Sequence, residues 1–298
     1  MLTSIHALTH HFPRAIGILF VAWMVGAAPT SGAADLTTIP ATQPTSQPAT
    51  RPAQTPVLAD NTVLYSNVPY GGPDATLNVL DIYAPPKFAS APALPVLIFV
   101  HGGEWSRGDK LNVSCKPKFF NEHGVLFVSL NYRLAPKDPH PAQVNDVATA
   151  IGWVHDHIAA YGGDPAKIVI MGHSAGCHLV TLVTLNPEAL ARVHLKPSDL
   201  RGTVAWSGGM SDLVDRANGP GLYPPFIKAT FGTSEKAQRA ASPLTYAKNA
   251  KEAPAFLIAS VDDDKSQSSR EASKKLLDAL NAAGGNAKAA LLEGKTHF

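Results

Sequence analysis

Nearly continuous apolar runs constrain the fold of this chain more than any other feature of its sequence. Four of them, "PVLIFV", "GVLFVSL", "KIVIM" and "FLIASV", begin at Pro95, Gly124, Lys167 and Phe256. Runs of this kind, bounded by turn-forming residues, are typical of strands buried on both faces of a parallel sheet. Two weaker runs, "GTVAWSG" and "AKAALLEG", predict further strands, and "TVLYSNV" with "LNVLDIYAP" predicts an opening antiparallel pair.

Helical patterns separate these runs. Residues 141–160 predict a helix with Pro141 near its start. Its apolar side chains recur at helical spacing, at Val144, Val147, Ala148, Ile151 and Val154. A second helix is expected just past Ser174, and a third from about Ser268 to Ala283, before Gly284-Gly285. Alternating strands and helices predict an α/β fold, with a mostly parallel, doubly wound sheet flanked by helices.

Residues 208–253 are rich in glycine and proline and carry only weak periodicity. They separate two predicted core strands. Two interpretations remain open, a small cap over the functional site and a plain surface excursion.

The first 34 residues are interpreted as a signal peptide. His10, His11 and Arg14 precede an apolar run of 14 residues, which is short for a membrane span. Small residues follow, so we expect cleavage after Ala33 or Ala34 and export to the periplasm or the extracellular space. The alternative is an uncleaved membrane anchor.

Composition sets the remaining boundaries. Residues 35–60 repeat Pro, Thr, Gln and Ala, which predicts a disordered linker. Residues 61–298 have the length for one α/β domain.

The net charge is only +2, and the basic residues are scattered along the sequence. We therefore expect no nucleic-acid partner and no stable membrane association after leader cleavage. For Cys115 and Cys177, two buried thiols are favoured over one disulfide bond.

The sequence "GHSAG" places Ser174 between Gly172 and Gly176 in the pattern G-x-S-x-G. The pattern alone occurs often by chance. Here it follows a predicted strand and opens a predicted helix, the context in which such a serine sits on a sharp turn as a nucleophile. The alternative is a packing role for small residues. The strand-turn-helix context favours the nucleophile.

A nucleophilic serine needs a base and a group that orients the base. On this scaffold the partners follow in the order serine, acid, histidine. His297, after the last predicted strand, is the predicted base; the alternative is a terminal surface histidine. Asp263 is the favoured acid, while Asp262 and Asp264 remain alternatives within the same loop.

The sequence "FVHGGEW" predicts the oxyanion hole, because glycines let backbone N–H groups approach a substrate carbonyl oxygen. The expected donors are the N–H groups of Gly102, Gly103 and Ala175, with Glu104 as an additional candidate. His101 is expected to brace this loop. Trp105 either lines the substrate pocket or packs in the core.

Twelve histidines raise the question of a metal site. His155 and His157 are two residues apart, and His173 and His178 are five apart, so neither pair has the i, i+4 spacing of helical ligands. No HExxH motif occurs. We expect neither a metal nor a cofactor.

Taken together, "HGGEW", "NYRLAP", Asp146, "YGGDP", "GHSAG" and "GKTHF" resemble α/β-hydrolases of the esterase/lipase type. The resemblance covers about residues 62–298 and is strongest to the branch with HGGxW, which includes carboxylesterases, feruloyl and acetyl-xylan esterase-like proteins and kynurenine formamidase-like enzymes. It implies that Ser174, His297 and Asp263 form the catalytic triad.

The resemblance also carries structural expectations. It implies that Asp146 braces the loop before the nucleophile strand and that Asp164 initiates a turn. Relatives usually carry a further helix after the base, whereas this sequence stops at Phe298. We therefore expect the C-terminal helix to be missing, leaving apolar surface exposed and His297 on a loose end.

These observations predict a serine hydrolase of the carboxylesterase type, which cleaves a small-molecule or polysaccharide-linked acyl ester through an acyl-enzyme. A kynurenine formamidase-like amide hydrolase is one alternative, although a leader counts against a cytosolic enzyme. A non-catalytic, exported binding module is another. Nothing in the sequence defines the peptide subsite that a peptidase needs.

Overall fold

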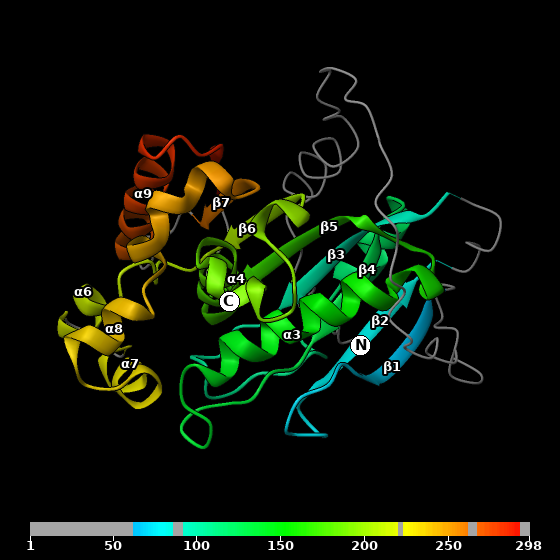
Figure 1. Cartoon of the computed structure of the whole chain (residues 1–298), viewed down its shortest axis with the longest axis horizontal. Coiled ribbons are helices and arrows are strands. Elements are labelled where there is room, and N and C mark those ends of the chain that lie inside the picture. The colour runs from blue at the N-terminus through cyan, green and yellow to red at the C-terminus, as the bar shows by residue number, and fades with distance from the viewer. Residues whose placement is uncertain (1–61, 86–91, 220–222, 262–266, 293–298) are drawn as a thin grey trace, which may run out of the picture.

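Eight strands form one sheet in the order β1-β2-β4-β3-β5-β6-β7-β8 in the computed structural model, which describes residues 62–85, 92–219, 223–261 and 267–292 (Figure 1). β2 pairs antiparallel with β1 and β4, and the strands from β4 to β8 are parallel. The strands are β1 Val63–Pro69, β2 Val79–Ala84, β3 Leu94–Val100, β4 Leu126–Leu130, β5 Gly163–His173, β6 Gly202–Trp206, β7 Ala255–Val261 and β8 Ala287–Leu292.

Helices connect the strands and cover both faces of the sheet. They are α2 Lys116–Glu122, α3 Ala142–His157, η1 Ile158–Tyr161, α4 Ala175–Leu185, α5 Pro187–Ala191, η2 Pro197–Asp199, α6 Leu213–Asn218, α7 Tyr223–Phe231, α8 Glu235–Ala240, η3 Pro243–Glu252 and α9 Gln267–Ala282. α3, α4 and α9 pack on one face, and α2 packs on the other. The predicted α/β architecture, the opening antiparallel pair and the three expected helices are confirmed.

Alternate side chains of β3 enter separate cores on the two faces of the sheet. Val96 and Ile98 pack with α3 and α4, whereas Leu97 and Phe99 pack with Phe120 of α2. All five side chains are buried. Both faces of β3 are thus covered by apolar side chains, which explains why its sequence is continuously apolar.

The segment between β6 and β7 is helical. It contains α6, α7, α8 and η3, and Figure 1 shows the first three grouped at the end of the molecule opposite β1. Phe231, at the end of α7, contacts the rings of Trp105 and His178. This segment is therefore packed against the loop after β3 and against α4.

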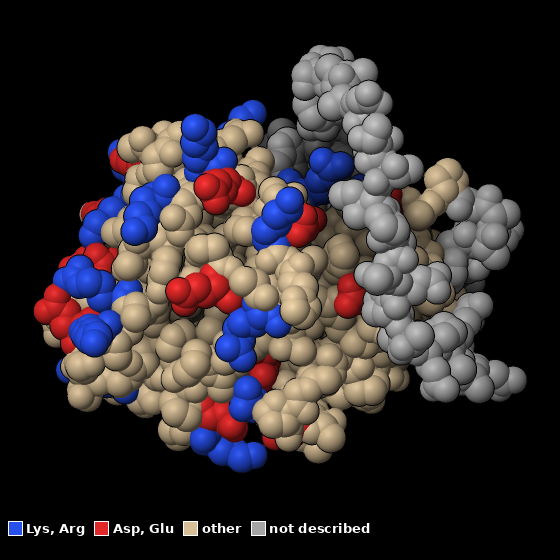
Figure 2. Space-filling model, in the orientation of Figure 1, with Lys and Arg blue, Asp and Glu red and all other residues tan. Residues whose placement is uncertain are grey.

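The predicted leader at residues 1–34 and the predicted linker at residues 35–60 lie outside the described residues. Within the described part of the chain, no helix has the length and apolar character needed to cross a bilayer. Figure 2 shows acidic and basic side chains interspersed on the face in view.

Both cysteines are free thiols, as predicted. The prediction that both are buried is correct for Cys177 and wrong for Cys115, which is exposed immediately before α2. Lys116 and Pro117, which begin α2, are buried, whereas Cys115 lies just outside the helix and is exposed to solvent.

A buried ion pair that no short-range sequence pattern predicts attaches the loop after β3 to the sheet. The Lys110 ammonium lies 2.8 Å from the Asp81 carboxylate on β2, and the two side chains are 6% and 0% exposed. The Lys110 N–H donates to Asn131 at 2.6 Å, and the Ser129 hydroxyl donates to the Lys110 carbonyl at 2.8 Å. Backbone and side chain of Lys110 are thus both held by residues of the sheet and its edge.

Removing one partner of this pair leaves the other charge buried and uncompensated. We expect Asp81→Asn to lower the free energy of unfolding by about 3 kcal/mol, measured by urea denaturation. The matched control is Asp278→Asn, which breaks the exposed Lys274–Asp278 pair and should change stability by less than about 0.5 kcal/mol. Equal effects of the two variants would contradict the structural importance of the buried pair.

Candidate active site

The carboxyl ends of three parallel strands bring the candidate residues together. Val100 of β3 pairs with Gly172 of β5, and His173 of β5 pairs with Trp206 of β6. The chain leaves β3 into the HGG segment and leaves β5 into Ser174. Two motifs about seventy residues apart in sequence therefore start at neighbouring positions on one edge of the sheet.

Ser174 occupies a strained turn between β5 and α4. Its φ of 54° and ψ of −116° lie in a region that costs a non-glycine residue about 1–2 kcal/mol. Its N–H donates to the Trp206 carbonyl at 3.1 Å, and its carbonyl accepts from the His178 N–H at 3.3 Å. The sharp turn predicted from the G-x-S-x-G pattern is confirmed.

Two glycines allow this turn. A β-carbon on Gly172 would collide with the carbonyl of Gly176, and one on Gly176 would collide with the carbonyl of Val100. The first turn of α4 therefore lies directly against the end of β3. Any larger residue at either position would push the helix away from the strand.

The HGG segment lies against the serine side chain. A β-carbon on Gly102 would be 3.0 Å from the Ser174 β-carbon and 2.9 Å from the His173 carbonyl oxygen. The structure thus brings Gly102 beside Ser174, with Gly103 following it and Ala175 opening α4. The predicted oxyanion residues and the predicted nucleophile share one small region.

His101 braces this loop, as predicted. Its ring is 2% exposed and stacks on Tyr132 with centroids 4.4 Å apart. His101 Nδ1 donates to the Gly102 carbonyl at 2.8 Å, and the Tyr132 hydroxyl donates to the His101 carbonyl at 3.0 Å. Burial lowers the pKa of His101 to about 4, so its ring is neutral near pH 7.

Trp105 is buried, with 1% of its surface exposed. Its Nε1 donates to His178 Nδ1 at 3.2 Å, and its ring meets those of His178 and Phe231 edge to face. These contacts favour the core-packing alternative over a pocket-lining role. His178, whose spacing from His173 argues against a metal site, is a hydrogen-bonding partner of this loop.

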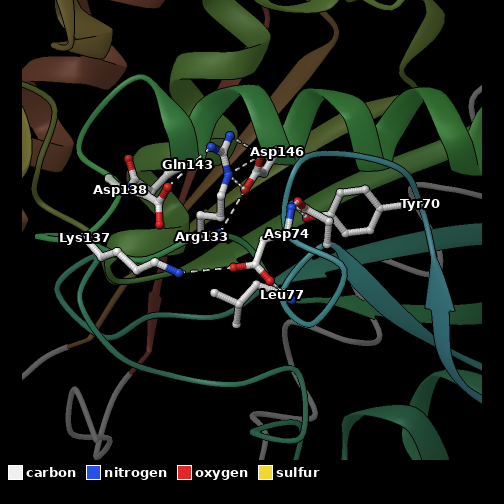
Figure 3. Close-up of polar contacts among 9 residues, drawn as sticks. Tyr70, Asp74, Leu77, Arg133, Lys137, Asp138, Gln143 and Asp146 are labelled. Carbon is white, nitrogen blue, oxygen red and sulfur yellow. Dashed lines mark hydrogen bonds and ion pairs between the residues drawn. The ribbon is translucent and has the colours of Figure 1, made fainter.

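The two aspartates with expected structural roles both depart from expectation. Asp146 on α3 accepts from the Arg133 N–H at 2.9 Å and from its guanidinium at 2.8 Å (Figure 3). It therefore braces the loop after β4, not the loop before the nucleophile strand, because α3 lies beside the Arg133 backbone. Asp164 accepts from the Ala166 N–H at 3.0 Å, but both residues lie inside β5, so the structure has a side-chain contact at the start of this strand where a turn was predicted.

The predicted acid and base, Asp263 with its alternatives Asp262 and Asp264, and His297, lie outside the described residues. The strands before them are described. β7 ends at Val261 and β8 at Leu292, and these two residues pair in register. Both strands are parallel to β5, so they end at the same edge of the sheet as the nucleophile turn.

Among the residues that the structure describes, no three histidine, cysteine or acidic side chains form a group that could hold a metal ion.

The fold, with the strained turn at Ser174 between β5 and α4, is that of an α/β-hydrolase. Residues 80–280 match the BD-FAE family model, and the chain belongs to this family. Curated relatives include esterase LipQ of Mycobacterium tuberculosis, 35% identical over 72% of this chain and 53% of its own length. A probable isoprenylcysteine alpha-carbonyl methylesterase of Arabidopsis thaliana is 32% identical over 78% of this chain and 50% of its own. The chain thus spans about half the length of these relatives.

Solved structures share the fold. Esterase B from Lactobacillus Rhamnosis superimposes with a TM-score of 0.66 at 20% identity, covering 81% of this chain and 77% of that one. A truncated carbohydrate esterase from gut microbiota gives a TM-score of 0.66 at 22% identity, covering 82% and 92%. At this identity the likeness establishes the fold alone.

The neutral His101 makes stability depend on pH. Because its pKa falls from 6.5 to about 4 on folding, the unfolded chain binds the proton first. Stability from this group is complete above pH 6.5 and is lost as pH falls towards 4, by roughly 3 kcal/mol. We expect His101→Phe, which keeps the stack on Tyr132, to remove this contribution from the fall in unfolding free energy over this range. His140 and His178, whose pKa values are also lowered by burial, keep their contributions.

Urea denaturation at a series of pH values measures this dependence. His123→Phe, a replacement of an exposed histidine, is the control and should retain the wild-type dependence. A His101→Phe profile that runs parallel to the wild-type profile would show that His101 is not the group involved.

Proposed function

We propose that this protein is a carboxylic ester hydrolase with Ser174 as its nucleophile. One observation carries the proposal: Ser174 lies in a strained turn between a strand and a helix, and Gly102 packs against its side chain. A strained serine costs stability, and such strain persists mainly where function requires it. The family and the esterase relatives support the same activity.

The proposed reaction is acyl transfer in two stages. His297 takes the proton from Ser174 as the oxygen attacks the ester carbonyl, and returns it to the departing alcohol. Water, activated by the same imidazole, then releases the acid from the acyl-enzyme. Asp263, with Asp262 and Asp264 as alternatives, orients the ring and stabilises its charged form. The parallel endings of β7 and β8 support these assignments.

The proposed oxyanion hole lies between the HGG loop and the start of α4. Backbone N–H groups of Gly102 or Gly103 on one side and Ala175 on the other would donate to the tetrahedral oxyanion. The N-terminal end of α4 adds a favourable dipole for negative charge. No metal or cofactor takes part in this scheme.

The proposed substrates are small-molecule or polysaccharide-linked acyl esters. Relatives named as esterases and methylesterases and a structural neighbour named as a carbohydrate esterase support this class. We also propose export, supported by the apolar run that precedes Ala33 and Ala34.

Ser174→Ala tests the function with p-nitrophenyl acetate as substrate. Removing the nucleophile should lower kcat by at least about a thousandfold, because the nucleophile and its base act as a unit. Ser66→Ala, at an exposed position on β1, is the matched control and should retain wild-type turnover. Circular dichroism checks the fold, and a fluorophosphonate should label wild type but not Ser174→Ala. Near-normal turnover in Ser174→Ala would refute the assignment.

A further inference from the structure

A buried junction of three rings lies behind the candidate active site. Trp105 follows the HGG segment, His178 belongs to the first turn of α4, and Phe231 ends α7. The ring centroids are 4.9 Å apart for Trp105–Phe231, 5.3 Å for Trp105–His178 and 5.1 Å for His178–Phe231. Interplanar angles of 66° to 85° are in the favoured edge-to-face range. The junction joins the oxyanion loop, the nucleophile helix and the segment between β6 and β7.

Both nitrogens of His178 are used, and the hydrogen bonds define one tautomer. The indole Nε1 of Trp105 is only a donor, so His178 Nδ1 must accept from it, at 3.2 Å. His178 Nε2 therefore carries the hydrogen and donates to the Ala241 carbonyl at 2.8 Å. Burial lowers the pKa of His178 to about 3, so this neutral tautomer persists in ordinary assay conditions.

The backbone that Trp105 anchors is strained. Glu104 and Trp105 have φ values of 49° and 58°, a conformation that costs each residue about 1–2 kcal/mol. The Trp105 carbonyl accepts from the Ala135 N–H at 2.9 Å, and its side chain is held by His178. These contacts hold the end of the loop whose Gly102 packs on Ser174.

We propose that His178 is a positioning residue for ester hydrolysis, acting through Trp105 to fix the oxyanion loop relative to Ser174. The inference rests on the proposed function. His178 sits one helical turn after Ser174, so it ties the loop to the same helix that carries the nucleophile. Ala241 ties this arrangement to the helical segment between β6 and β7.

Loss of the Trp105–His178 bond should affect kcat more than KM. The oxyanion loop binds charge that develops only in the transition state, so a displaced loop weakens transition-state binding with little effect on the bound substrate. A defect in folding alone would instead lower the melting temperature and leave kcat of the folded fraction unchanged.

Trp105→Phe and His178→Leu test the proposal with p-nitrophenyl acetate. Each removes one partner of the bond while keeping an apolar side chain in the junction. We expect each to lower kcat about tenfold with KM within about twofold, and the double variant to be no worse than the more impaired single variant. His178→Asn, which restores an acceptor near the Nδ1 position, should recover part of the lost kcat.

Trp153→Phe is the matched control, because Trp153 also stacks on a histidine, His157, but on α3. It should retain wild-type kcat. If wild type is active and Trp105→Phe keeps kcat within twofold, the proposal is wrong while the proposed function stands. If purified, folded wild type hydrolyses no ester, both fail. If His178→Leu does not fold by circular dichroism, Trp105→Phe decides the question.

Discussion

The parallel pairing of β5 between β3 and β6 is the constraint on which the site depends. Val100, His173 and Trp206 end neighbouring strands at one edge, so the residues that follow them must meet. The close approach of α4 to β3 then requires glycine at residue 176. Backbone pairing therefore sets the distance between Ser174 and the HGG loop, independently of side-chain contacts.

Local sequence predicts the strands, the main helices and the serine turn because each depends on short-range patterns. Apolar continuity marks strands covered on both faces, and G-x-S-x-G marks the turn. The contacts that brace the loop are different in kind. His178 is 73 residues from Trp105, and spacing within one helix cannot show what its ring meets across the fold.

The Lys110–Asp81 pair is not marked by the sequence. Asp81 lies between Leu80 and Ile82, an alternation that also fits a strand with one face in solvent, so the complete burial of its carboxylate is known only from the fold. The partner's identity still depends on tertiary structure, since Lys110 is 29 residues away in a loop. The same limit explains Asp146: the resemblance implies that it braces a loop, but the position of α3 decides which loop it contacts.

Burial fixes the charge state of the histidines around the loop. His101, His140 and His178 all have pKa values lowered mainly by desolvation, to about 4, 4 and 3. The neutral rings of His101 and His178 donate to the carbonyls of Gly102 and Ala241 without adding charge to the loop beside Ser174. The support of the loop by these rings is therefore insensitive to pH near neutrality.

The helical segment between β6 and β7 supports the loop from behind. Phe231 supplies a ring to Trp105, and Ala241 supplies the acceptor for His178. Without that carbonyl, the His178 N–H would be a buried, unsatisfied donor, at a cost of about 1–3 kcal/mol. A surface loop between two strands would not need buried contacts of this kind with Trp105 and His178. They make the segment part of the framework that holds the HGG loop beside Ser174.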